Sequence, residues 1–109
     1  MEIDVLKRLS ATLAERKLAE PGSSYVASLY AKGTDAICKK VAEEAAETIM
    51  AAKDGEPAHL AYEVADLWFH SLILLGHFGL DADAVLAELQ RREGVSGITE
   101  KQSRKQEGA

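Results

Sequence analysis

The sequence is poor in the residues that several classes of protein require. Its 109 residues include a single cysteine, Cys38, so neither an intramolecular disulfide framework nor a thiolate zinc site can be assembled. Acidic residues outnumber basic ones by 18 to 13, and the net charge of −5 argues against nucleic acid or an anionic membrane as the main partner. Glycine-rich phosphate loops and the GxSxG nucleophile motif are absent. An anionic substrate would therefore need a cation to bridge it to this chain.

Long apolar runs are also missing. The longest, over residues 67–80, is interrupted by His70 and His77 and falls short of the ~20 residues that span a bilayer. Residues 1–17 carry charged side chains at both ends, which leaves no room for the apolar region of a signal peptide. We expect a soluble protein of the reducing cytoplasm that neither binds nor crosses a membrane.

The apolar periodicity predicts helices and no strand. Apolar residues recur at near-helical spacing, and glycine, proline and capping residues separate the periodic segments. We expect helices over about residues 3–19, 24–32, 34–53, 57–78 and 82–93, followed by a polar, mobile tail over residues 95–109. The predicted fold class is all-α: a single domain over residues 1–109, formed by a bundle of about five helices with a central antiparallel hairpin. Cys38 is predicted to be a buried thiol on an apolar helix face.

Two acidic motifs lie on the two helices of the predicted hairpin. Glu43, Glu44 and Glu47 form an EExxE motif, and Glu63 and Asp66 form an ExxD motif. Acids spaced by three residues share one helix face. Glu47 and Glu63 are each eight residues from the turn glycine, and Glu44 and Asp66 are each eleven residues from it. Equal offsets in an antiparallel hairpin mean equal heights, so four carboxylates could converge on one spot.

Such a group of carboxylates repels itself unless cations balance it, and hard divalent ions prefer oxygen ligands. Mg²⁺ is the natural candidate, with Mn²⁺ as a substitute. An EExxE motif alone is more often a solvated helix face. The next helix, however, is apolar on nearly all sides, and Glu63, Asp66, His70 and His77 share one narrow arc. Carboxylates in a buried helix are costly unless they are paired or bind a metal, which favours a metal site, whereas a lone histidine such as His70 is more often structural.

Longer motifs around these acids resemble a known family. The acids alone resemble the MazG-like superfamily of all-α nucleoside triphosphate pyrophosphohydrolases. The wider pattern resembles the phosphoribosyl-ATP pyrophosphatases, in their stand-alone form. It consists of Ser24-Tyr25 with Leu29 and Gly33, the segment 40–45 (KVAEEA), the segment 63–67 (EVADL) with His70, and Ser96-Gly97 followed by Glu100-Lys101 and Arg104. The resemblance covers about residues 4–105 and departs from the typical family pattern at Ala42 and at Trp68-Phe69, none of which is a proposed ligand.

The resemblance implies an enzyme that hydrolyses phosphoribosyl-ATP to phosphoribosyl-AMP and pyrophosphate, the second step of histidine biosynthesis. It implies Mg²⁺-assisted attack of water at the α–β phosphoanhydride and a homodimer with substrate sites near the interface. The catalytic acids would be Glu43, Glu44, Glu47, Glu63 and Asp66. All of these except Glu43 would bind the metal; Glu43 would be a further ligand, a general base or an exposed neighbour. Lys40, Arg92, Lys101 and Arg104 could bind substrate phosphate from the same or the partner subunit.

Two other functions remain open from the sequence. A house-cleaning pyrophosphohydrolase acting on non-standard or deoxynucleoside triphosphates would keep the acidic motifs but would not need the tail that carries Lys101 and Arg104. A non-catalytic helical dimer could use the same acids to bind a structural or regulatory cation. The tail favours phosphoribosyl-ATP.

Overall fold

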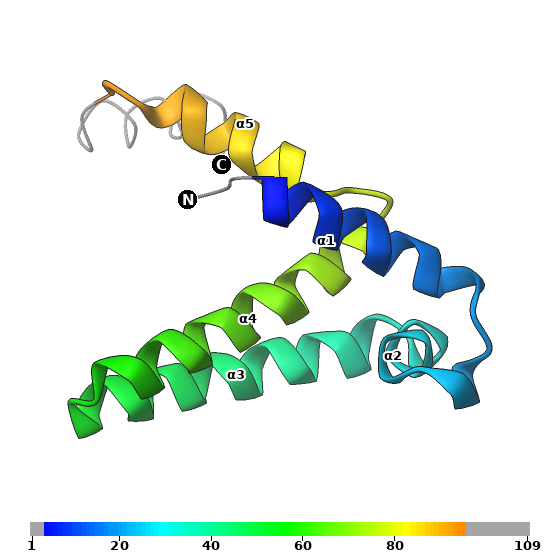
Figure 1. The fold of residues 1–109 in the computed structure, drawn as a ribbon, viewed down its shortest axis with the longest axis horizontal. Coiled ribbons are helices and arrows are strands. Elements are labelled where there is room, and N and C mark those ends of the chain that lie inside the picture. Colours follow the sequence, from blue (N-terminus) through cyan, green and yellow to red (C-terminus); the bar gives the residue numbers. More distant parts are fainter. Residues whose placement is uncertain (1–3, 96–109) are drawn as a thin grey trace.

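The computed structural model describes residues 4–95, and these residues form helices and connecting turns without a strand (Figure 1). Two short 3₁₀ turns, Arg16–Leu18 and Pro21–Ser23, connect the first helix to the second. The α-helices are α1 (Asp4–Glu15), α2 (Tyr25–Lys32), α3 (Thr34–Asp54), α4 (Pro57–His77) and α5 (Ala82–Arg92). The predicted all-α class and five helices are confirmed. None of the helices in residues 4–95 is both long and apolar enough to span a membrane.

Local chemistry sets the helix boundaries. Gly55 ends α3 in the left-handed conformation, with φ of 76°, and Pro57 opens α4 at its first turn, where a missing N–H costs nothing. Ser24 caps α2 by accepting a hydrogen bond from the backbone N–H of Ala27. Asp81 caps α5 in the same manner. These are the boundaries that the sequence predicts, to within a residue or two.

The first helix is shorter than its apolar pattern predicts. The α-helix ends at Glu15 rather than near residue 19, and the chain tightens into the 3₁₀ turn that ends at Leu18. Leu18, which continues the apolar pattern, is 93% exposed. Cys38 is also exposed, contrary to prediction, whereas its neighbour Ile37 is completely buried. In both cases the helix is covered on one side only, so the adjacent side chain points to solvent.

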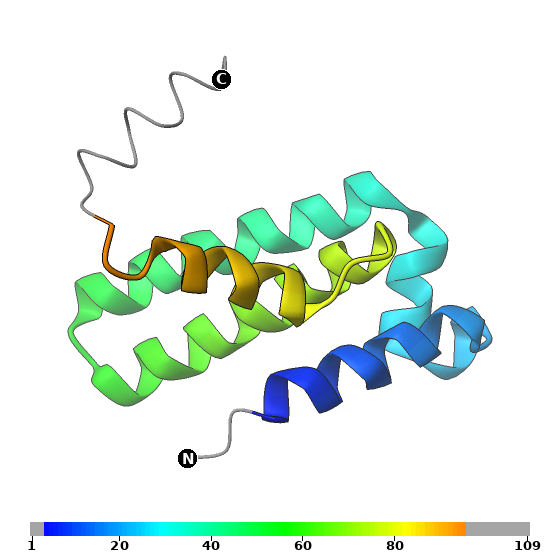
Figure 2. The ribbon, with the colours of Figure 1, turned by 90° about the horizontal axis from the view of Figure 1, so that it is seen from above.

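Helices α3 and α4 form the long antiparallel hairpin, and α1 and α2 lie toward its open end (Figure 1). The short helix α2 lies beside the start of α3, and α1 packs against α4. The view from above shows α5 running back over the hairpin (Figure 2). The backbone N–H of Ala82, at the start of α5, donates to Ser10 Oγ on α1 at 3.1 Å. The buried core lies where these helices meet and consists of Leu13, Val26, Leu29, Ile37, Leu72, Ile73 and Ala82.

An apolar groove separates α5 from α4 and is closed at one end by α1. We call it the α4–α5 groove; its lining is Leu6, Trp68, Ser71, Leu72, Leu75, Ala82, Val85, Leu86 and Leu89. Trp68 is 58% exposed and Leu89 is 53% exposed. The groove therefore leaves a continuous apolar surface uncovered in the single chain.

Candidate metal centre on the α3–α4 hairpin

Three carboxylates meet between the two helices of the hairpin, and we call them the acid cluster. Glu44 comes from α3, and Glu63 and Asp66 come from α4. One oxygen from each lies within 4.8 Å of the others. Glu44 and Glu63 are buried, and Asp66 is half-buried. The i,i+3 spacing on α4 places its two acids on the face that meets α3.

The charge of Glu44 is poorly compensated in the chain alone. Its Oε1 lies 3.6 Å from Lys40 Nζ, while its buried Oε2 has no hydrogen-bond partner among residues 4–95. Burial raises the pKa of Glu44, and the neighbouring carboxylates of Glu47 and Asp66 raise it further. A buried carboxylate oxygen without a donor, next to two more carboxylates, is a donor set that fits a hard divalent cation. The residues present are therefore suited to hold Mg²⁺.

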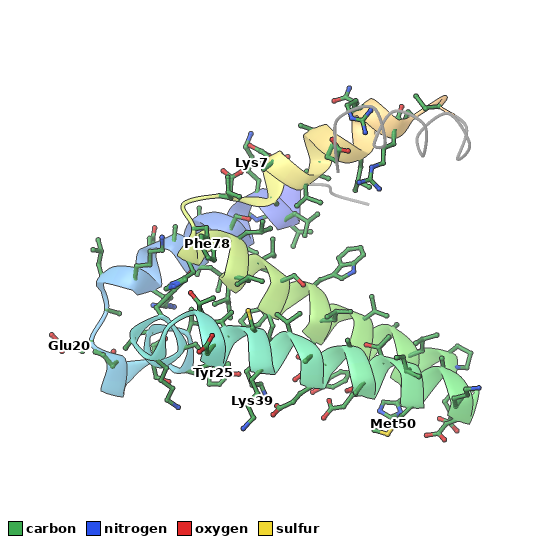
Figure 3. The ribbon with its side chains drawn as sticks, turned by 180° about the vertical axis from the view of Figure 1, so that it is seen from behind. Lys7, Glu20, Tyr25, Lys39, Met50 and Phe78 are labelled. Atoms are coloured by element: carbon green, nitrogen blue, oxygen red, sulfur yellow. The ribbon has the colours of Figure 1, made fainter. Side chains whose placement is uncertain are left out.

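Glu47 lies at the side of the acid cluster and not inside it. It is exposed and does not belong to the group of oxygens within 4.8 Å, although it is close enough to Glu44 to affect that residue's pKa. It lines a hollow next to the cluster together with Glu63 and His59. Met50 lines the same hollow and lies on α3 near the hairpin turn (Figure 3). The sequence predicts that four carboxylates meet, whereas three meet in the structure and Glu47 lies at the rim.

The other residues expected at the site have different surroundings. Glu43 is exposed, and its Oε2 pairs with Lys40 Nζ at 3.1 Å, so Lys40 lies between Glu43 and Glu44. Arg92 pairs with Glu88 on its own helix at 3.1 Å, and α5 contributes no described residue to the acid cluster or to the hollow beside it. Lys101 and Arg104, together with the SerGly and GluLys segments, lie outside the described residues.

His70 is buried one turn after Asp66. Its Nδ1 lies 2.9 Å from the backbone oxygen of Asp66, and its Nε2 lies 2.8 Å from the hydroxyl oxygen of Tyr25. Both ring nitrogens therefore have hydrogen-bond partners among the described residues. The structural role that the sequence favours for His70 stays a prediction.

Sequence reasoning did not identify two side chains at this site. His59 Nε2 lies 4.0 Å from Glu63 Oε1 across one helical turn, and the i,i+4 spacing was the available signal. Tyr25 reaches the site from α2 and was not placed there, because no periodicity connects α2 to α4. Figure 3 shows Tyr25 beside the part of α3 that carries Lys39.

Comparison with known proteins gives the chain its relatives. The family model described as phosphoribosyl-ATP pyrophosphohydrolase matches residues 6–93. A phosphoribosyl-ATP pyrophosphatase of Azoarcus sp. (strain BH72) is 73% identical over 105 residues, which cover 96% of this chain and 98% of that protein. One of Aromatoleum aromaticum is 74% identical over 104 residues, covering 95% and 96% of the two chains. One of Chromobacterium violaceum is 61% identical over 105 residues, covering 96% and 97%.

Proposed function

The chain belongs to the phosphoribosyl-ATP pyrophosphohydrolase family, and we propose that the acid cluster on its α3–α4 hairpin is the active site. The protein is a hydrolase of histidine biosynthesis that converts phosphoribosyl-ATP and water to phosphoribosyl-AMP and pyrophosphate. The single observation that carries the site assignment is the buried oxygen of Glu44, which has no donor in residues 4–95 and lies beside the carboxylates of Glu63 and Asp66.

Glu44, Glu63 and Asp66 would hold Mg²⁺, and Glu47 would complete the ligand set from the rim by a change of side-chain rotamer. Mn²⁺ would substitute, because it accepts the same oxygen ligands. Bound there, Mg²⁺ supplies neutralisation of phosphate charge and polarisation of a water for attack at the α–β phosphoanhydride. The burial of Glu44 and Glu63 supports this assignment, because bulk water cannot freely replace these carboxylates at a bound cation.

The remaining polar residues would handle the substrate and the attacking water. Lys40 Nζ lies within 3.6 Å of Glu44 and is positioned to meet a phosphate brought to the cluster. Glu43 would hold the Lys40 ammonium in place through their 3.1 Å contact. This role for Glu43 is an alternative to the roles of a further metal ligand or a general base. The exposed position of Glu43 supports it. Lys101 and Arg104 would add charge to the phosphate site.

The α4–α5 groove supports a homodimer. A small domain gains stability when a partner covers apolar surface, and this groove exposes Trp68, Val85, Leu86 and Leu89 together. A second copy seated on this surface would pack its helices into one bundle with the first, as in other helical dimers. Such packing would also bring residues of the partner, Arg92 among them, toward the hairpin.

We further infer that the enzyme works in the cytoplasm. The family acts on a phosphorylated small molecule, and the exposed thiol of Cys38 would remain reduced in that compartment.

The test is pyrophosphate release from phosphoribosyl-ATP, with ATP and dCTP as comparison substrates, each with Mg²⁺ and with EDTA. We expect metal-dependent release from phosphoribosyl-ATP and little from the other two. Preference for ATP or dCTP would move the enzyme to the house-cleaning class. Absence of release from all three would favour a cation-binding protein.

A further inference from the structure

The hydrogen bonds of His70 fix the orientation of its ring. The backbone oxygen of Asp66 can only accept, so the Nδ1 of His70 carries the hydrogen of the 2.9 Å contact. The other ring nitrogen, Nε2, forms a 2.8 Å hydrogen bond with the Tyr25 hydroxyl. His70 is 5% exposed, and its ring lies edge-on to the Tyr25 ring, with centroids 5.8 Å apart. The His70 ring is thus held at both nitrogens.

Tyr25 reaches this ring from another part of the fold. It is the first residue of α2, directly after the Ser24 cap, and the bond to His70 joins residues 45 apart in the sequence. Burial raises the pKa of Tyr25; Lys40 opposes this, and the carboxylates of Glu44, Glu43 and Asp66 raise it further. The phenol therefore remains protonated at neutral pH, and the charges of the nearby carboxylates act on it.

We propose that Tyr25 and His70 are positioning residues for the acid cluster: the bond between them ties the start of α2 to the turn of α4 that presents Asp66. This inference rests on the proposed Mg²⁺ site. Asp66 is the least buried member of the cluster, and repulsion from the carboxylates of Glu44 and Glu63 would push it outward without a cation. The His70 ring is bonded to the backbone oxygen of Asp66 and to Tyr25 on α2, and these two bonds oppose that movement.

The first experiment compares Tyr25→Phe with Tyr62→Phe in the full chain. Tyr25→Phe removes one oxygen from a half-exposed residue, so the fold should survive, and Tyr62→Phe removes an exposed hydroxyl from another turn of α4. Loss of an outer partner of a metal ligand typically weakens metal binding by about 10- to 100-fold. We expect calorimetric titration with MgCl₂ to show a roughly tenfold higher dissociation constant for Tyr25→Phe and no change for Tyr62→Phe.

A double-mutant cycle with His70→Gln separates positioning from direct contact. If Tyr25 acts through His70, adding Tyr25→Phe to His70→Gln should not weaken Mg²⁺ binding further. Independent, additive losses would overturn the proposal. So would an unchanged Mg²⁺ affinity of Tyr25→Phe accompanied only by a lower melting temperature, because a merely structural role predicts that result. Failure of the unmodified protein to bind Mg²⁺ would instead remove the metal site itself, and this inference with it.

Discussion

Glu44 on α3 and Glu63 on α4 bring carboxylate oxygens within 4.8 Å of each other, although the two residues are only 5% and 6% exposed. Two acids in such a place are unfavourable unless something positive joins them. Lys40 approaches one oxygen of Glu44, and the other has no partner among residues 4–95. A cation held between these carboxylates would lower the cost of the arrangement.

Replacing Glu44 by Gln should separate stability from activity. The amide keeps the shape but removes the buried charge, so the metal-free variant should unfold at a higher denaturant concentration than the unmodified protein at neutral pH. Loss of a buried metal ligand should lower kcat/KM for phosphoribosyl-ATP by about 100-fold or more. That is at least the largest loss typical of changing a residue that only hydrogen-bonds to a metal ligand. Urea unfolding in EDTA and a pyrophosphate-release assay measure the two effects. Full activity in this variant would remove Glu44 from the site.

Stability of the metal-free protein should fall as pH rises above the ordinary glutamate value of 4.5. Burial, Glu47 and Asp66 raise the pKa of Glu44 in the folded chain. A carboxyl whose pKa is higher in the folded than in the unfolded chain favours folding while it is protonated. Its contribution to stability is complete below the pKa of the unfolded chain and is lost as the pH rises through the pKa of the folded chain. Unfolding measured in EDTA across this range should show the decline, and Glu44→Gln should reduce it. Equal slopes in the two proteins would contradict the prediction.

Glu47→Gln should weaken Mg²⁺ binding less than Glu44→Gln does. Glu47 is exposed at the rim, where water can replace a lost ligand, whereas Glu44 is enclosed. We expect an affinity loss of about tenfold for Glu47→Gln, measured by the same titration. Asp54→Asn, in the same hollow but outside the acid cluster, is the matched control. Unchanged affinity and turnover in Glu47→Gln would exclude Glu47 as a ligand.

Trp68→Glu should separate the homodimer proposed above. A charge in the α4–α5 groove would have to be buried against the partner, and loss of an interface tryptophan alone typically costs about 2 kcal/mol or more, ~30-fold in affinity. Sedimentation equilibrium across a range of concentrations measures the change. Leu18→Glu, at a position 93% exposed and outside the groove, should leave the assembly intact. Equal dissociation constants for the two variants would place the interface elsewhere.

Gly76 and Tyr30 should behave as a coupled pair. A Cβ at Gly76 would lie 2.6 Å from the Tyr30 hydroxyl oxygen, which is buried without a partner among residues 4–95. Gly76→Ala should therefore cost about 1–3 kcal/mol of unfolding free energy, despite the better helix propensity of alanine. Tyr30→Phe alone should be neutral or stabilising, because it removes an unsatisfied hydroxyl. Thermal unfolding should show that the double variant recovers most of the loss; a strictly additive result would rule out the clash.

The sequence by itself determined the number of α-helices, most of their boundaries and the hairpin between the third and fourth. Apolar periodicity, Ser24, Gly55, Pro57 and Asp81 are local signals, and local signals suffice for elements whose hydrogen bonds lie within four residues of each other. The i,i+3 spacing of acids and their equal offsets from the turn placed Glu44 and Asp66 at matching heights. The acidic motifs and their flanks also indicated the family, which the comparisons show.

Only the tertiary structure decided which acids are enclosed and what holds them. Glu44 is buried and Glu47 is exposed, although both are on one face of α3, because the neighbouring helices cover that face only in part. The bond between Tyr25 and His70 joins segments 45 residues apart, and no periodicity within one helix reports such a distance. Tertiary packing also decided that Cys38 is exposed and that a groove remains between α4 and α5. Whether a side chain is buried depends on where the neighbouring helices end, and the packing of the helices sets those positions.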